Sequence, residues 1–354
     1  MRTYVITAVL ILLSVLGHHN HAMAAMPLFI IAAAAIVPLA GILGKATEEI
    51  SMRQGPALGG LLNATFGNAT ELILALMAIR SGGHLLEMVK ASITGSIIGN
   101  LLLVLGAAIV AGGLRYKSMS INPRSAGMTS SMMLLAVIGL VVPAVFARVR
   151  PDANPVLLQN MSLMVAGILM LIYFLGLLFA FGTHRHVFNP DGSGADEEPE
   201  EPEWSMMTAV SVLLGTTLLV VLESEILVDA VQELIESMHL SPIFLGAVVI
   251  AIVGNAAEHA VAIMVARRGR MELAFQIACG SSTQVALFVA PFLVFASVLM
   301  GQPMNLLFTL FEVIAILASV VLVSVISQDG ETNWLEGAQL LAVYAILCVA
   351  FFYL

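Results

Sequence analysis

Two glutamates in this sequence stand inside apolar stretches, each three residues after an asparagine. Glu71 follows Asn68 in GNATELILALMAIR, and Glu258 follows Asn255 in GNAAEHAVAIMVAR. Because residues three apart share one face of a helix, each pair would present a carboxylate and an amide together. Brought into one place, the four side chains would offer the oxygen ligands that hard divalent cations such as Ca²⁺ prefer.

The composition shows why these carboxylates are unusual. Hydrophobic residues make up 60% of the 354 residues and charged residues only 10%, and the mean hydropathy is +1.01. Soluble domains carry roughly 25% charged residues, so this chain is predicted to be solvated mainly by lipid. Backbone polar groups cannot stay unpaired in hydrocarbon, which leaves a helical bundle or a closed barrel. Because the apolar runs are unbroken rather than alternating, we predict an all-α, polytopic membrane bundle.

Eleven apolar segments are predicted to cross the membrane. They cover residues 4–17, 27–44, 57–79, 91–112, 126–146, 156–182, 205–229, 243–266, 273–298, 305–327 and 335–354. The first segment is short, and the AMA at residues 22–24 resembles a signal-peptidase site. Its removal is therefore an alternative to its retention as a membrane helix.

The two Asn–Glu motifs are copies of one longer pattern. GNATELILALMAIRSG aligns with GNAAEHAVAIMVARRG without a gap, and SITGSIIG at residues 92–99 aligns with IACGSSTQ at residues 277–284 after a two-residue deletion. The copies lie on the third and the eighth predicted spans. Because these spans are five apart, an odd number, the two copies enter the membrane in opposite directions. We therefore predict two inverted five-helix repeats plus an N-terminal helix, an architecture typical of secondary transporters.

This pattern divides the chain into five parts. They are an N-terminal helix and loop (residues 1–26), spans 2 to 5 of the first half (27–150), the sixth span (151–190), an acidic linker (191–203) and the second half (204–354). The linker contains DEEPEEPE, whose charges and prolines prevent it from packing into a core. We predict that it either gathers cytoplasmic cations or is a solvated tether.

Lys and Arg residues are unevenly distributed between the two sides of these spans. Ten lie on the side of the N-terminus and the linker, and four, namely Arg80, Lys90, Arg148 and Arg150, lie on the other side. The positive-inside tendency places the N-terminus and the linker in the cytoplasm and the C-terminus outside. The short loops favour the cell (inner) membrane of a prokaryote, with an organelle membrane as the alternative.

A lone buried glutamate can be a structural hydrogen-bond partner, but a matched pair is harder to explain in that way. A charge at the bilayer centre costs on the order of 2.5–3.5 kcal/mol on the insertion scale. Because this cost arises twice, at matching positions of the two copies, we predict that Glu71 and Glu258 are functional. Ser96, Ser281 and Gln284 on the following spans can supply further oxygens. Two facing carboxylates cannot easily both stay ionised without a cation, so protons and a divalent cation would exclude each other.

These motifs resemble the repeat signatures of the Ca²⁺/H⁺ antiporter (CAX) family of the cation/Ca²⁺ exchanger superfamily. The resemblance rests on GGLLNATFGNATELI with GSIIGNLLLVLG and on GNAAEH with GSSTQ, and it extends to PLAGILGKATEEI, FGTHRHVFNP, the acidic linker and NWLEG. It implies exchange of cytoplasmic Ca²⁺ for H⁺ by alternating access, with Glu71 and Glu258 carrying both ions. It also implies that five polar residues complete or support the site: Asn68, Asn255, Ser96, Ser281 and Gln284.

Two positions distinguish the copies from each other or from the family. Gly99 stands where many members of the family are expected to have serine, so the first half would lose one oxygen. His259 follows Glu258, whereas Leu72 follows Glu71. Beside a titrating carboxyl we predict a proton-handling role for His259, with a hydrogen-bonded core histidine as the alternative.

The chain is therefore predicted to be a transporter and not an enzyme. Its expected partners are Ca²⁺, H⁺ and the lipid bilayer, with no cofactor, no nucleic acid and a possible homo-oligomer. Because oxygen cages are permissive, an exchanger selective for Mn²⁺, Na⁺ or K⁺ is the alternative. A membrane hydrolase would need an HExxH helix or a nucleophile with its base, which Glu258 and His259 do not form. A passive channel has no evident use for a proton-coupled carboxylate pair.

Further acidic residues lie near the ends of predicted spans, where they are possible linings of the two ion entrances. They are Glu48 and Glu49 on the cytoplasmic side and Glu223, Glu225 and Asp229 towards the outside. Acids at helix ends are common, so an ordinary solvated role is equally open. Glu312 has no partner in the other repeat and is predicted to be structural. The His18, His19 and His21 group is predicted to be an exposed loop rather than a metal site.

Overall fold

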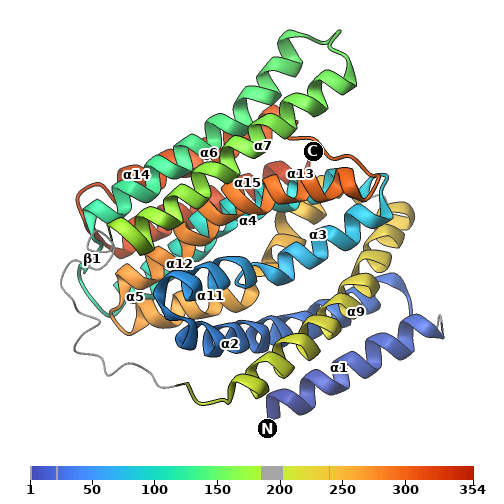
Figure 1. Ribbon diagram of the computed structural model, residues 1–354, viewed down its shortest axis with the longest axis horizontal. Coiled ribbons are helices and arrows are strands. Elements are labelled where there is room, and N and C mark those ends of the chain that lie inside the picture. Colours follow the sequence, from blue (N-terminus) through green and yellow to red (C-terminus); the bar gives the residue numbers. More distant parts are fainter. Residues whose placement is uncertain (1, 21–22, 185–201, 239) are drawn as a thin grey trace.

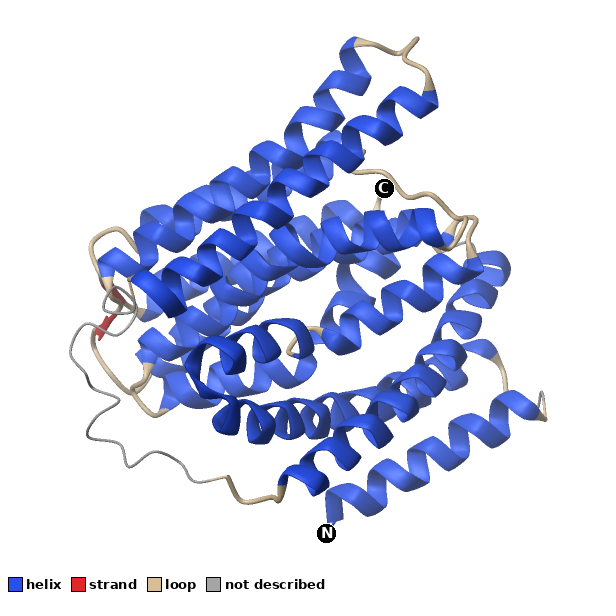
Figure 2. Ribbon diagram, viewed as in Figure 1, coloured by secondary structure: helices blue, strands red, loops and turns tan. Residues whose placement is uncertain are grey.

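The computed structural model describes residues 2–20, 23–184, 202–238 and 240–354. Within these residues the helices join into eleven helical segments, and Figures 1 and 2 show them packed into one bundle. Eight segments are long and apolar enough to cross a membrane, and Tyr4–His19 and Leu310–Ile326 are shorter apolar helices. The predicted all-α membrane bundle is confirmed. Most of the acidic linker, together with His21, lies outside the described residues.

The helices of the first half include two stretches of π-helix. Their bounds are α1 Arg2–His19, α2 Ala25–Phe66, α3 Ala69–Ser81, α4 Leu85–Ile98 continued by η1 Gly99–Val104 and α5 Leu105–Gly113, α6 Pro123–Val149, and α7 Pro155–Leu177 continued by η2 Leu178–Thr183. Those of the second half are α9 Met206–Met238, α10 Pro242–Phe244 continued by η3 Leu245–Ile250 and α11 Ala251–Arg267, α12 Met271–Gln284 continued by η4 Val285–Val289 and α13 Ala290–Leu299, α14 Leu310–Ile326 and α15 Trp334–Phe352.

Side chains in the loops define where several helices begin. Asn122 accepts hydrogen bonds at the start of α6, Asn154 does so at the start of α7, and a proline follows each of them. Asn caps and first-turn prolines both favour a helix start. Thr309 and Glu312 form a capping box at the start of α14, and Glu312 also accepts a hydrogen bond from Thr94 of α4 at 3.1 Å. These contacts agree with a structural role for Glu312.

The prediction of separate second and third spans differs from the structure at their boundary. The expected loop over residues 45–56 is helical, because α2 runs for 42 residues from Ala25 to Phe66. The break lies instead at Gly67 and Asn68, inside the predicted third span. The stretch KATEEISMRQ contains mostly good helix formers, so its charges mark a polar environment rather than the end of a helix.

Three helices form one side of the bundle. In Figure 1, α2, α9 and α1 lie along its lower edge; α2 packs along α9, and α1 packs against both. The α6–α7 hairpin lies on the opposite side, where α6 packs against α14. The helices that carry the repeated motifs, α3, α4, α11 and α12, lie between these two groups (Figure 2). A short antiparallel pair, β1 Met119–Ser120 with β2 Glu331–Thr332, joins two loops.

Glycines allow two pairs of segments to pack backbone against backbone. A Cβ atom on Gly95 of α4 would lie 2.0 Å from the Ala247 carbonyl oxygen of η3, and one on Gly246 would lie 2.3 Å from the Met88 carbonyl oxygen of α4. Gly106 of α5 and Gly337 of α15 approach each other in the same way. Small residues of this kind let membrane helices approach closely. The contact of α4 with η3 brings the two halves of the chain together beside the repeated motifs.

The residues just before α9 form an ion pair and hydrogen bonds with α2. Lys45 lies 2.7 Å from Glu203 and 5.3 Å from the centre of the Trp204 ring. The Trp204 backbone N–H donates to Glu49 at 3.0 Å, and Arg53 donates to the Trp204 carbonyl. The Lys45 ammonium holds the pKa of the exposed Glu203 carboxyl below its usual value. These contacts attach the end of the acidic linker to the α2 side of the bundle.

Candidate functional site

The break between α2 and α3 positions the first candidate glutamate. Glu71 lies in the first turn of α3, and Asn68 occupies the position before that helix. The Asn68 side chain makes no capping hydrogen bond, so its amide is free to reach the second half. A helix N-terminus favours a nearby negative charge because its backbone N–H groups lack intrahelical partners. The break therefore places the Glu71 carboxylate at a helix N-terminus, which favours its charge, and leaves the Asn68 amide available for other hydrogen bonds.

The first polar network joins Glu71 to the second half of the chain. Ser96 of α4 donates a hydrogen bond to Glu71 Oε1. Asn255 of α11 donates one amide hydrogen to Ser96 Oγ and the other to the Ala251 carbonyl, both at 3.0 Å. Glu71, Ser96 and Asn255 are all buried, with at most 4% of each residue exposed. The structure thus brings three predicted site residues into one chain of hydrogen bonds that crosses between the halves.

The second network uses the corresponding residues with a different pattern of bonds. Ser281 of α12 donates to Asn68 Oδ1 at 3.1 Å, and Asn68 donates its amide hydrogen to Gln284 Oε1 at 2.7 Å. Gln284 aligns with Gly99, which has no side chain to offer Asn255 in return. The amide of Asn68, in the first copy, therefore bonds to Gln284, whereas the amide of Asn255, in the second copy, bonds to Ser96. The two copies of the motif therefore form different hydrogen bonds.

Asn100 is a member of this network that the sequence analysis did not identify. It lies in η1, is 1% exposed, and donates to Ser281 Oγ at 3.1 Å. The dipeptide Gly99–Asn100 repeats the Gly–Asn pair of both motifs, and that signal was present in the sequence. Asn100 thus occupies one of the two acceptor sites of the Ser281 hydroxyl, which itself donates to Asn68.

The two glutamates each keep one oxygen without a partner. Oε2 of Glu71 and Oε2 of Glu258 are buried and accept no hydrogen bond within the described structure. The two carboxyls lie close enough to interact electrostatically, and the helices that carry them are in contact, since a Cβ atom on Gly254 would lie at the ordinary contact distance of 3.6 Å from Glu71 Cβ. Glu258 and its neighbour His259 are half-buried on α11. Unsatisfied buried carboxyl oxygens are expensive, so they point to a ligand that is a cation or a proton.

The available donors suit a hard cation and not a soft one. In the described ranges no three His, Cys, Asp or Glu side chains come together as a metal cluster. Additional ligands to the two carboxyls would therefore be amide, hydroxyl or backbone oxygens. Such a donor set matches Ca²⁺, which accepts several neutral oxygens beside carboxylates, and does not match metals that prefer thiolates or imidazoles.

The predicted entrance residues lie in different environments. Glu48, Glu225 and Asp229 are exposed, while Glu49 and Glu223 are buried. Arg80 lies 3.9 Å from Glu225, and His18 lies 3.2 Å from Asp229. Glu49 accepts from Trp204, and Glu223 contacts Ser14 of α1. The exposed three remain candidates for an entrance.

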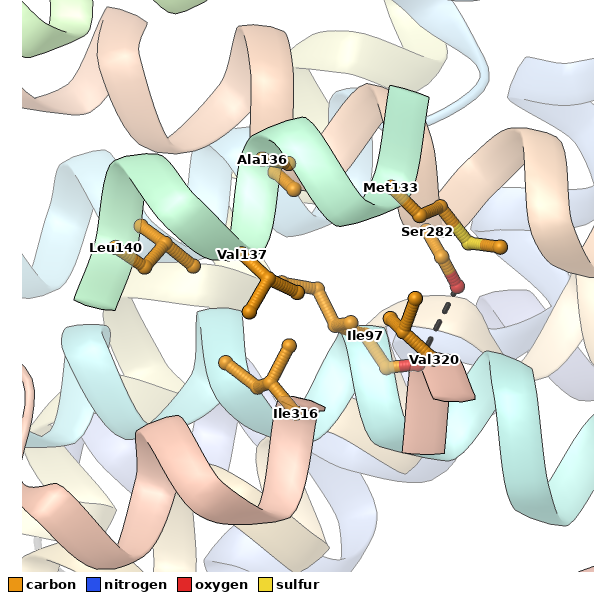
Figure 3. A pocket seen from close by; sticks show the side chains of 9 residues that line it. Ile97, Met133, Ala136, Val137, Leu140, Ser282, Ile316 and Val320 are labelled. Carbon is orange, nitrogen blue, oxygen red and sulfur yellow. Dashed lines mark hydrogen bonds between the residues drawn. The ribbon is translucent and has the colours of Figure 1, made fainter. Parts of the chain in front are cut away.

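A separate small cavity lies between α4, α6, α12 and α14 (Figure 3). It is lined by Ile97, Met133, Ala136, Val137, Leu140, Ser282, Ala286, Ile316 and Val320. Its one polar side chain, Ser282, is already bonded to backbone carbonyls, that of Ile97 at 3.3 Å among them. This cavity is a packing gap without charge and does not belong to the ion site.

Comparison with known proteins places this arrangement in a family. The model of the sodium/calcium exchanger protein family matches residues 24–182 and 208–353, which include every residue of the two networks. The chain belongs to this family.

Relatives of the exchanger are similar over nearly its whole length. It is 46% identical over 338 residues to the Ca²⁺/H⁺ antiporter of Synechocystis, covering 92% of this chain and 90% of that protein. It is 43% identical over 352 residues to the Ca²⁺/H⁺ antiporter ChaA of Bacillus subtilis, covering 99% of both. The structure of native YfkE matches with a TM-score of 0.85 at 38% identity and covers 99% of this chain and 100% of that one. The resemblance to the Ca²⁺/H⁺ antiporter family is confirmed, and the exchanger is an integral membrane protein.

Proposed function

We propose that the exchanger is a secondary active transporter that moves Ca²⁺ out of the cytoplasm in exchange for H⁺. The observation that carries this proposal is the meeting of Glu71 and Glu258, one from each motif, with one unpartnered buried oxygen on each. Relatives at 46% and 43% identity are named Ca²⁺/H⁺ antiporters, which supports transport rather than catalysis. Ca²⁺ and H⁺ are substrates here.

The site chemistry couples the two ions because each satisfies the same oxygens. A Ca²⁺ ion would stabilise both carboxylates at once, whereas in its absence two facing charges in a low dielectric favour the uptake of protons. The loaded states are then close to neutral, and the empty, doubly charged site is the costly one to carry across the membrane. Asn68, Asn255 and Ser96 would act by orienting the carboxyls and by offering further oxygens.

We propose that the repeat is inverted and that it supplies the basis for alternating access. We propose that the third and eighth predicted spans, residues 57–79 and 243–266, are equivalent and enter the membrane in opposite directions. Support comes from bonds that cross between the halves, namely Asn255 to Ser96 and Ser281 to Asn68. The backbone is broken at Gly67–Asn68 but helical through Gly254–Asn255. An exchange of these two conformations between the halves would open the site to the other side of the membrane.

Ion flux in proteoliposomes tests this function directly. With purified exchanger and an imposed pH gradient, Ca²⁺ is expected to move against the proton flow, and Mn²⁺, Na⁺ and K⁺ are expected to support much slower proton movement. Liposomes without protein provide the control. Equal or faster exchange with Na⁺ or K⁺ would favour a monovalent exchanger and contradict the proposal.

Membrane orientation is tested by single cysteines in a variant lacking Cys279 and Cys348. We propose that the N-terminus and the linker are cytoplasmic in a prokaryotic cell membrane. Ser193→Cys in the linker is then expected to be protected from an impermeant thiol reagent in intact cells, whereas Ala153→Cys, between α6 and α7, is expected to react. The opposite labelling pattern would reverse the orientation.

His259 is proposed to relay protons to or from Glu258, its neighbour on α11. His259→Ala is expected to retain Ca²⁺ binding but to slow exchange several-fold and to change the pH profile of its rate, because a titratable group beside the site is lost. The exposed His84, which precedes α4, provides the matched control through His84→Ala. A rate–pH curve for His259→Ala that coincides with that of the control would leave His259 a structural residue.

A further inference from the structure

Glu223 is a buried carboxyl outside the repeated motifs, at the interface of α1 and α9. Glu223 of α9 and Ser14 of α1 both have 0% of their surface exposed. Ser14 Oγ lies 2.6 Å from Glu223 Oε1. The carboxyl thus belongs to the contact between the N-terminal helix and α9, which packs along α2.

The number of hydrogens at this contact indicates the protonation state of Glu223. Ser14 Oγ also lies 2.9 Å from the Ile11 carbonyl oxygen. A serine hydroxyl has a single hydrogen, and a backbone carbonyl can only accept. If Ser14 donates to Ile11, the short contact to Oε1 must be donated by Glu223. Both contacts are therefore separate, two-centre hydrogen bonds only when the Glu223 carboxyl carries a proton.

In the part of the chain that the structure describes, no cation lies beside Glu223 to stabilise a carboxylate. Its other oxygen, Oε2, is buried and has no hydrogen-bond partner within the described structure. Among the described residues, Ser14 interacts with the Glu223 carboxyl and no cation does. The charged groups on the neighbouring helices contact other residues: His18 pairs with Asp229, Arg80 faces Glu225, and Lys45 of α2 pairs with Glu203. A buried charge without a counter-ion is strongly destabilising, whereas a neutral acid leaves only a carbonyl-like oxygen unpaired.

We propose that Glu223 is a second proton-binding site, separate from the Glu71–Glu258 pair, in which the protonated carboxyl donates to Ser14 and fastens α1 to α9. When the proton leaves, Ser14 must turn from Ile11 to the carboxylate, and a charge without a counter-ion remains in the interface. The contact of α1 with α9 then weakens. Because α9 packs along α2, the proton stabilises one arrangement of these three helices. This inference does not depend on which cation the exchanger carries, since it concerns a proton held at another place.

Infrared spectroscopy of the purified, full-length exchanger tests the site without any transport assay. A protonated carboxyl has a C=O band that a carboxylate lacks. At neutral pH the band of the wild type is expected to exceed that of Glu223→Gln by the equivalent of about one carboxyl per chain, because protons on the Glu71–Glu258 pair contribute equally to both spectra. Gln preserves both contacts, because its amide can donate to Ser14 while Ser14 donates to Ile11, so this variant is expected to fold. Glu225→Gln, at an exposed position on the same helix, is the matched control and is expected to retain the band.

Ser14→Ala provides the second, independent measurement. It removes the acceptor of the Glu223 proton, so the band is expected to persist but to move towards the frequency of a carboxyl that is not hydrogen-bonded. Identical spectra in this region for the wild type and Glu223→Gln would show an ionised Glu223 and overturn the proposal. An unmoved band in Ser14→Ala would overturn the pairing of Glu223 with Ser14.

Discussion

Glu71→Gln and Glu258→Gln are each expected to abolish Ca²⁺-driven proton flux in proteoliposomes. Gln retains the shape of the side chain and can still accept from Ser96 at position 71, so the hydrogen-bond geometry is preserved and the charge is removed. One remaining carboxylate compensates too little for the dehydration of a divalent cation, and one proton carrier is lost. The loss should exceed the roughly 10–100-fold cost typical of residues that only support metal ligands.

The double variant and an exposed control make this test specific. Glu71→Gln combined with Glu258→Gln is expected to be no worse than either single variant, because residues that act as a unit are not additive. Glu236→Gln changes an exposed carboxyl near the end of α9 and is expected to leave the flux unchanged. Near-normal exchange by either single variant would remove that glutamate from the shared site. Both variants are expected to fold, since neither introduces a charge.

Gly95→Ala is expected to destabilise the exchanger by about 1–3 kcal/mol or more and to inactivate it. The new Cβ atom would lie 2.0 Å from the Ala247 carbonyl oxygen, so the backbones of α4 and η3 must move apart, and overpacking of this kind is costly. The same displacement moves Ser96, the adjacent residue, away from Glu71 or Asn255. The measurement is the temperature of unfolding in detergent, followed by Ca²⁺ flux at a temperature where the variant is folded.

The second copy of the motif supplies the matched control for this change. Gly280 aligns with Gly95 in the sequence, yet a Cβ atom on Gly280 would meet nothing within 4 Å. Gly280→Ala is therefore expected to be neutral or to stabilise α12 by up to about 1 kcal/mol, since alanine favours a helix over glycine. Equal destabilisation by the two substitutions would contradict the close contact of α4 with η3.

Local patterns in the sequence predicted most of the architecture. Long apolar runs predicted eleven membrane-crossing helices because a helix is the simplest way to pair backbone groups in lipid. The described residues form eleven helical segments, and eight of these are long and apolar enough to cross a membrane. The three-residue spacing of Asn68 and Glu71 predicted a shared face. The repeat predicted that the second copy would meet the first, and the bond from Asn255 to Ser96 crosses between them. These features depend on periodicity and residue type, which the sequence contains in full.

The details of the site depended on distant parts of the chain. The sequence alone determined that two Asn–Glu pairs and their serines are available, since their types and spacing are local properties. Only the tertiary structure decided that Asn68 bonds to Gln284 while Asn255 stays on Ser96, and that Glu223 meets Ser14 of α1. Aligned positions of two sequence copies have nearly the same local pattern, but each packs against a different neighbour. Hydrogen bonding and packing are set by those neighbours, so two similar motifs adopt different states within one fold.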